Sequence, residues 1–258
     1  MRASILDDVK VTVPARIASQ AWLNAMLASS KEPSRPLICQ TLSVEVFETK
    51  GVQFIATNGH VLFRTWAPVN GSRTWPAMRY RPDRQLTVMD PDGFGLGFMR
   101  ALLRVTSEET HVDEQLTITS APVDDEAAPS FGAEFQTERV TLRACGQRLD
   151  LLVRDEPYPD WRKLKLGLDE MAFVDGMKVQ PKYLGLVGRL KDITAVDMTF
   201  AGNDRAIWID ANGEQGYGVK GLLMPMRRLE TGTKDEPETA LDENDDDVND
   251  QVGDEDRG

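Results

Sequence analysis

The stretch Val11-Thr12-Val13-Pro14, followed by an apolar-faced pattern over residues 15–29, decides the fold because the same arrangement occurs three times. It returns as Leu86-Thr87-Val88 before residues 93–105, and as Met177-Lys178-Val179 before residues 182–191. In each case a short strand reaches a proline and then a helical pattern. Proline suits a first helical turn, where its missing N–H would have no partner anyway. The sequence therefore predicts an internal repeat.

Each predicted helix is followed by alternating, β-branched segments that predict three strands. Runs of antiparallel strands after each helix indicate an α+β fold, with the helices on one face of antiparallel sheets. The apolar helix faces are expected to pack inward, including Phe94 in the second helix and Leu184 in the third. The predicted strands cover residues 38–48, 52–57, 61–66, 115–119, 139–144, 149–153, 196–200, 206–209 and 217–224. We expect a domain over residues 1–164 with two units (about 9–69 and 85–155), a third unit within 165–229, and a tail over 230–258.

Acidic residues are excluded from all three helical regions, although the whole chain carries a formal net charge of −12. Residues 9–31, 93–107 and 176–191 hold no Asp or Glu. We therefore expect these helices to face an anion, with a basic surface that suits nucleic acid. The candidate DNA-binding residues are Lys10, Arg16, Arg100, Arg104, Lys178, Lys182, Arg189 and Lys191.

The acidity is concentrated in the tail, where residues 230–258 hold 13 acids and two bases. Removing that net −11 from −12 leaves the preceding 229 residues at only −1. A segment with so few apolar residues cannot offset the entropy of ordering, so we expect it to be disordered. Two interpretations stay open for it: a solubilising extension, or an electrostatic mimic that docks a partner.

No pattern in the sequence indicates catalysis. The segment Gly93-Phe94-Gly95-Leu96-Gly97 lacks the Lys-Ser/Thr of a phosphate loop, and predicts a helix start with close backbone approach instead. His60 and His111 lie near no cysteine or second histidine, so we expect no metal site and no cofactor. No apolar run is long enough to span a membrane. We expect no enzymatic activity.

Three short segments are more informative. Residues Thr57-Asn58-Gly59-His60-Val61-Leu62 contain an Asn-Gly turn between two apolar runs, which is a strong hairpin signal. Residues Tyr158-Pro159-Asp160-Trp161-Arg162-Lys163-Leu164 read as an exit linker held by aromatic rings. Residues Leu222-Leu223-Met224-Pro225-Met226-Arg227 end the last strand just before the acidic tail.

In this order, the three segments resemble the bacterial DNA polymerase III β sliding clamp family. That family has a Thr-Asp-Gly-His-Arg-Leu turn, a Phe-Pro-Asp-Tyr-Arg-Arg exit and a Val-Met-Pro-Met-Arg-Leu terminus. The resemblance covers about residues 10–228, most clearly 35–62. Here Asn58 and Val61 replace a family aspartate and arginine, so a polar contact from position 61 is not expected.

The resemblance implies a ring whose helices surround duplex DNA without reading its sequence. It also implies a pocket for a short linear motif carried by DNA polymerase and the clamp loader. The matching residues are Ile38, Thr57, Gly59, His60, Leu62, Pro159, Leu164, Leu222, Met224, Pro225 and Met226. Side chains at strand ends and methionines usually pack in the hydrophobic core. An ordinary core is therefore the alternative interpretation of these positions.

The chain departs from the family in size, since it has three units where the family has six. Twelve units per ring would need four chains, and an open, monomeric or differently assembled form is also possible. We expect a shortened clamp in the cytoplasm of a bacterial or phage-infected cell, acting as a homo-oligomeric processivity factor, and the compact size suggests a phage or mobile-element origin. The alternative is a clamp-like decoy or adaptor that binds replication proteins without encircling DNA.

Truncation after Leu229 tests the interpretation of the tail. Thermal stability should stay nearly unchanged, because the tail lacks the apolar residues that packing needs. Affinity for non-specific duplex DNA should rise, because the field of the tail opposes phosphate. Thermal melts and DNA titrations of the full and truncated chains measure both effects, and a large loss of stability would show a structural tail.

Overall fold

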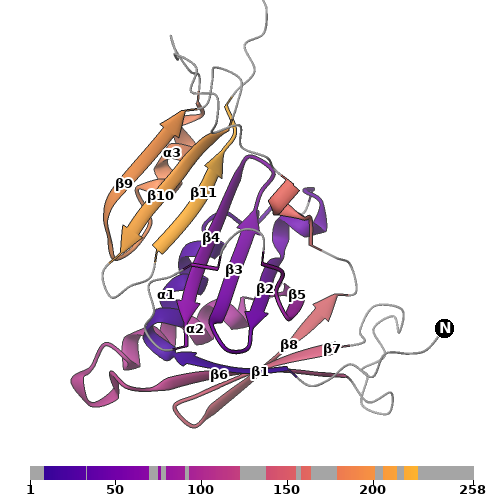
Figure 1. Cartoon of the computed structure of the whole chain (residues 1–258), viewed down its shortest axis with the longest axis vertical. Coiled ribbons are helices and arrows are strands. Elements are labelled where there is room, and N and C mark those ends of the chain that lie inside the picture. Colours follow the sequence, from indigo (N-terminus) through magenta and orange to yellow (C-terminus); the bar gives the residue numbers. More distant parts are fainter. Residues whose placement is uncertain are drawn as a thin grey trace, which may run out of the picture. The chain divides into compact units, whose positions relative to one another are not determined.

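The computed structural model describes residues 9–32, 34–69, 75–76, 80–90, 93–122, 138–154, 158–163, 179–200, 206–213 and 218–225 (Figure 1). The acidic tail and the predicted strand residues Met177 and Lys178 lie outside this set. No described helix is long and apolar enough to cross a membrane.

The first two predicted units are present as strand, helix and three strands. The first consists of β1 (Val9–Pro14), α1 (Ala15–Met26), β2 (Leu42–Phe47), β3 (Gly51–Thr57) and β4 (Val61–Pro68). The second consists of β5 (Arg84–Met89), α2 (Phe94–Val105), β6 (Gln115–Pro122), β7 (Glu138–Ala144) and β8 (Gln147–Arg154). The third shows α3 (Pro181–Val187), β9 (Ile193–Phe200), β10 (Ile207–Gly213) and β11 (Gly218–Leu223). Short 3-10 turns cover Leu37–Gln40, Glu109–His111 and Trp161–Lys163.

The strands in the described part of the chain form one 11-stranded sheet in the order β1-β6-β7-β8-β5-β2-β3-β4-β11-β10-β9 (Figure 1). All the ladders are antiparallel, so the α+β prediction is confirmed. The first two units exchange strands: β1 lies along β6 of the second unit, and β5 lies along β2 of the first. The third unit joins the first through β11 and β4, where Leu222 lies opposite Leu62. The domain boundary predicted at residue 164 lies outside the described residues, so the division into domains stays a prediction.

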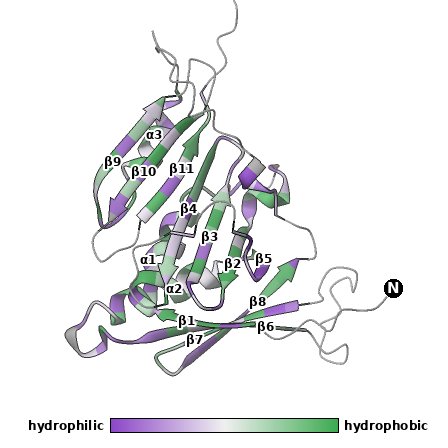
Figure 2. Ribbon diagram, viewed as in Figure 1, coloured by the Kyte–Doolittle hydropathy of each residue, from purple (hydrophilic) through white to green (hydrophobic). Residues whose placement is uncertain are grey.

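The main core lies between the sheet and the helices. In Figure 2 hydrophobic residues are prominent along the strands, and one side of each strand supplies this core. Small residues such as Ala18, Ala21 and Ala25 let α1 approach the sheet closely, and Trp22 packs edge-on against Phe54 at 5.4 Å between ring centroids. The Thr65 hydroxyl of β4 donates to the carbonyl of Ala21 at 2.8 Å, which fixes the helix on the sheet.

The start of α2 shows why glycine occurs there. Gly93 has φ 73°, a left-handed conformation that suits glycine. A Cβ on Gly95 would lie 3.0 Å from a carboxylate oxygen of Asp90 and 3.1 Å from the Trp22 ring of α1. The carboxylate of Asp90 accepts from the N–H groups of Gly95 and Leu96 at 2.9 and 3.0 Å. The prediction of close backbone approach is therefore confirmed.

Several sequence-based boundaries and faces are wrong. The helix predicted over residues 15–29 ends at Met26, and the one predicted over 182–191 ends at Val187. The strand predicted from residue 38 begins at Leu42, because a 3-10 turn follows Pro36. Phe94 is exposed at the first position of α2, and Leu184 is exposed because no other described helix covers that side of α3.

A second, smaller cluster covers the sheet face opposite the helices. Its buried members are Ile55, Leu62, Tyr158, Trp161 and Leu222, with Ile38, Ala206 and Trp208 packed against them. The exit segment over residues 158–163 therefore crosses the outside of the sheet as an anchored strap, in agreement with the aromatic linker that the sequence predicts.

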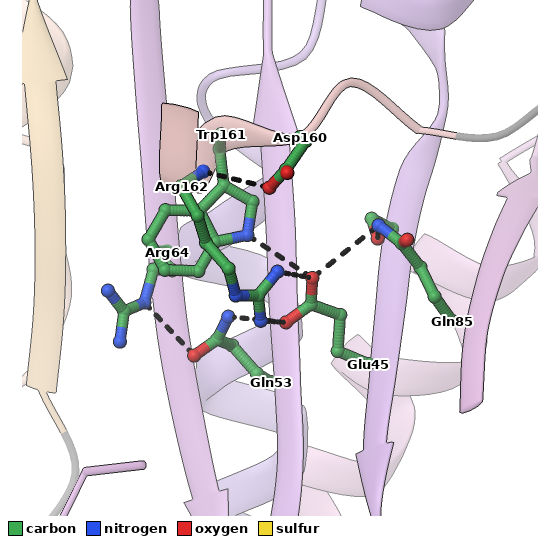
Figure 3. A network of polar contacts seen from close by, with 8 residues as sticks. Glu45, Gln53, Arg64, Gln85, Asp160, Trp161 and Arg162 are labelled. Carbon is green, nitrogen blue, oxygen red and sulfur yellow. Dashed lines mark hydrogen bonds and ion pairs between the residues drawn. The ribbon is translucent and has the colours of Figure 1, made fainter. Parts of the chain in front are cut away.

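The strap is anchored on a buried carboxylate, Glu45 of β2 (Figure 3). The Arg162 guanidinium makes two parallel bonds to it, at 2.8 and 2.6 Å, and Trp161 Nε1 donates to it at 3.2 Å. Gln53 also donates to Glu45 at 2.9 Å, and accepts from Arg64 Nε at 3.0 Å. A bidentate pair between arginine and a carboxylate is among the strongest hydrogen-bonding geometries in proteins.

Glu45→Gln should destabilise the protein by about 3 kcal/mol, because the substitution leaves the largely buried Arg162 guanidinium without its charge partner. The control is Glu32→Gln, which removes an exposed ion pair with Arg35 and should cost less than about 1 kcal/mol. Urea unfolding measures both. Equal losses would contradict an anchoring role for Glu45.

Candidate functional site

A basic groove of about 950 Å³ lies where the three helices meet. The C-terminal part of α1, the segment after it, α2 from Leu96 onward, and α3 with its following residues line it. Among the lining residues seven are basic and one, Glu32, is acidic; the basic ones are Lys31, Arg35, Arg100, Arg104, Lys182, Arg189 and Lys191. The groove therefore concentrates positive charge from segments far apart in the chain.

Two features hold the groove together. The first is the close packing of α1 on α2 at Gly95 and Trp22. The second is Asn24 of α1, whose side chain donates to the Lys191 carbonyl and accepts from the Lys191 N–H, both at 3.1 Å. This paired contact fixes the segment after α3 against α1. The C-terminal end of α1 carries the negative end of its dipole, so the positive potential there comes from the basic side chains.

Five of the eight predicted DNA-binding residues line the groove: Arg100, Arg104, Lys182, Arg189 and Lys191. Lys10 does not, because it alternates along β1 with the buried Val9 and Val11 and so faces away from the helices. Arg16 lies in the first turn of α1, outside the lining set, and Lys178 lies outside the described residues.

Sequence reasoning missed two basic residues of the groove, Lys31 and Arg35. The absence of acids over residues 9–31 is a signal that could have found Lys31. No sequence pattern indicates Arg35, which follows α1 in an irregular segment and reaches the groove only because that segment folds back.

The predicted turn after β3 is present and tightly bonded. The Thr57 hydroxyl donates to the Val61 carbonyl at 2.8 Å, and Asn58 Oδ1 accepts from the N–H groups of His60 and Val61, both at 2.9 Å. Gly59 has φ 85°, which explains the glycine. The Met224 N–H donates to the His60 carbonyl at 2.8 Å, so the turn and the end of the last strand are joined.

His60 connects this turn to the groove. Its Nε2 lies 3.3 Å from Nη2 of Arg35, and its ring stacks on Tyr183 of α3 with 5.0 Å between centroids. Burial lowers the pKa of His60, and the positive charges of Arg35 and Lys182 lower it further. A neutral imidazole with an unprotonated Nε2 can accept the hydrogen bond from Arg35. Arg35 and Tyr183 also line the groove, so groove and turn share side chains.

Three of the residues predicted for the partner pocket belong to the smaller cluster on the sheet face opposite the helices, called here the outer cluster, and that cluster is filled. Ile38, Leu62 and Leu222 pack in it, and Thr57, Gly59 and His60 form the neighbouring turn. A void of only about 10 Å³, bordered by Trp161 and Trp208, lies beside Leu62 and Leu222. That is enough for about one water molecule. Pro159 and Met224 are exposed and Pro225 is partly exposed, whereas Leu164 and Met226 lie outside the described residues.

Arg64 borders the same void and was not predicted. Its guanidinium stacks between Trp161, at 4.2 Å, and Trp75, at 4.9 Å. Burial lowers the pKa of Arg64 to about 10, against the opposing effect of Glu45. The side chain therefore stays charged at neutral pH. Nothing in the sequence around Arg64 distinguishes it from an ordinary strand residue.

Among the described residues, no cluster of His, Cys, Asp and Glu side chains could hold a metal ion. Three of the buried or half-buried acids there serve in structural ion pairs, Glu45 with Arg162, Glu138 with Arg84, and Asp210 with Lys220, whereas Asp90 accepts from backbone N–H groups of α2. What the described surface offers chemically is a basic groove and an aromatic cluster.

Solved structures of bacterial sliding clamps share this fold. The DNA polymerase sliding clamp of Bacillus subtilis matches with a TM-score of 0.55 and 15% identity over 88% of this chain and 66% of the clamp. The ligand-bound sliding clamp of Pseudomonas aeruginosa gives 0.55 and 11% over 85% and 66%. The DNA polymerase III β chain of Streptococcus pneumoniae gives 0.53 and 13% over 88% and 67%.

No protein-family model and no curated protein matches the sequence. The chain spans about two thirds of the length of the clamps that it matches. The resemblance that the three short segments indicate is confirmed at the level of architecture: this chain has the fold of the bacterial DNA polymerase III β sliding clamps.

Proposed function

We propose that this chain is a sliding clamp, a non-enzymatic processivity factor that encircles duplex DNA and tethers a polymerase. The single observation that carries the proposal is the groove in which seven basic side chains and one acidic side chain gather where three helices meet. The whole chain is strongly acidic, so this segregation is not a consequence of composition.

The basic side chains of the groove suit binding to the phosphates of the DNA backbone better than recognition of its bases. Lys and Arg on helices neutralise phosphates, and such binding is independent of sequence and falls steeply with salt. A protein that slides needs contacts of this kind, since phosphates recur at every step along the duplex. Clamp structures share the fold, which supports a ring assembled from several chains as the form that encloses DNA.

The partner is a short linear motif of a polymerase or clamp loader, bound at the outer cluster beside the Thr57–Leu62 turn. Because the void there is only about 10 Å³, binding requires neighbouring side chains to move. Met224 suits that role: it is exposed beside the cluster, and methionine repacks easily around different ligands. The site of action is the cytoplasm of a bacterial or phage-infected cell.

A second candidate is a clamp-like adaptor or decoy that binds replication proteins without encircling DNA. The observation that favours it is that the turn, the strap and the last strand, which make up the candidate partner site, all lie within one chain. The two candidates differ in the groove, since an adaptor has no need for its positive charge.

Charge reversal of Arg100, Arg104, Lys182 and Arg189 to Glu should abolish binding to duplex DNA without unfolding the protein, because these side chains supply most of the charge of the groove. In milder single variants, each lost phosphate contact should reduce the salt slope by about one. Fluorescence anisotropy on a labelled duplex at several salt concentrations measures both.

The matched control for the groove is Lys10→Glu with Arg16→Glu, which reverses charges outside the lining set. This variant should keep most of the affinity and the slope. If the groove variant binds like the wild type, or if both variants lose binding alike, the groove is not the DNA site and the adaptor is the better assignment.

A peptide with a Gln-x-x-Leu-Phe-like sequence should bind the outer cluster with micromolar affinity, roughly −8 kcal/mol. Burial of its apolar anchors supplies most of that, at about 1.5–3 kcal/mol for each side chain. Met224→Ala should weaken binding by about tenfold, equal to about 1.4 kcal/mol. Its side chain is 46% exposed, so the variant should remain folded.

Titration calorimetry tests this, with Leu152→Ala as the control for loss of an exposed apolar side chain elsewhere. If the peptide binds neither the wild type nor the variants, or binds all three equally, the cluster is ordinary core and not a partner site.

A further inference from the structure

The helix-facing side of β9 is left uncovered. Val196 and Phe200 lie directly opposite Ala211 and Ile207 of β10, so their side chains share a face with these two. Ala211 and Ile207 are buried in the main core. Val196 and Phe200 are nevertheless 37% and 40% exposed. Apolar side chains on the core side of the sheet therefore lie open to solvent.

The corresponding strands of the first two units are covered. Like β9, β2 and β6 are the first strands after the helix of their units, and their core-facing Leu42, Val44, Leu116 and Ile118 are all buried. They are covered because each unit receives a strand from the other, β5 along β2 and β1 along β6. In the part of the chain that the structure describes, β9 pairs with β10 alone.

The helix layer of the third unit is incomplete in the same way. In the first two units α1 and α2 pack on each other, with Gly95 of α2 against Trp22 of α1. Leu184 of α3 is exposed, and no other described helix covers it. The described third unit thus resembles one half of the structure that the first two units make together.

We propose that the third unit binds the third unit of a second copy of this chain. The two copies are related by a two-fold axis, and each covers the other's β9 edge and core face. The argument for a second copy is reciprocity: units one and two complete each other by mutual strand addition. Two identical third units can complete each other in the same way under two-fold symmetry, because the same surface of each copy then contacts its counterpart on the other. An open edge beside exposed apolar side chains is otherwise an aggregation hazard.

This interface does not rest on DNA or peptide binding, since the groove and the outer cluster lie within one chain. Its failure would leave the proposed function standing with another mode of assembly. A loss of DNA binding in the groove variant would equally leave this interface untouched.

Light scattering coupled to size-exclusion chromatography tests the proposal on the full chain at tens of micromolar. The wild type should show at least twice the chain mass of 28.8 kDa. The double variant Val196→Lys with Phe200→Lys should halve that mass, because lysine on an edge strand opposes pairing. The control Val112→Lys, at an exposed apolar position outside β9, should keep the wild-type mass. Circular dichroism checks that the variants are folded.

A wild type with the mass of one chain, or a folded double variant with the wild-type mass, would overturn the proposal. Hydrogen exchange of the wild type gives a test that needs no variant. All amides of β9 should be protected if a second copy lies along it. Fast exchange at alternate amides of β9, as in an open edge strand, would show that no second copy pairs with β9.

Discussion

A strand exchanged between neighbouring units is the constraint on which the rest of the structure depends. A three-stranded sheet has two open edges and a partly covered core face, and in the first two units β1 pairs with the β6 edge and β5 with the β2 edge. That exchange brings α1 and α2 side by side on one face of the sheet. Both helices line the basic groove, so the groove depends on the exchange.

The opposite face of the sheet is organised by a single buried carboxylate. Glu45 receives bonds from Gln53, Trp161 and Arg162, and this holds the exit strap over the outer cluster. A buried charge is costly unless every lone pair finds a donor, so the network is stable only as a complete set. The strap places Trp161 over Leu62 and Leu222 and leaves only a small void there. The side chains of the protein itself therefore occupy the candidate partner site.

The basic groove and the turn over residues 57–62 meet at His60, whose ring contacts Arg35 and stacks on Tyr183. Arg35 lines the groove, and the carbonyl of His60 receives the N–H of Met224 at the end of the last strand. Burial lowers the pKa of His60, and the positive charges of Arg35 and Lys182 lower it further, which favours a neutral ring beside the Arg35 guanidinium. The inner and outer faces of this fold are therefore joined by direct side-chain contacts.

The sequence by itself determined the repeat, the α+β class, the Asn-Gly turn and most of the basic residues of the groove, because strand alternation, helix periodicity and missing acids are local patterns. It did not show that Lys10 lies outside the groove, because the direction of that side chain depends on which face of β1 the core occupies, and it did not indicate Arg35 or Arg64. Only the tertiary structure decided which charges share a surface, that Trp161 and Trp208 border the space beside Leu62, and that β9 stays uncovered. These properties depend on contacts between residues distant in the chain, and no local pattern encodes such contacts.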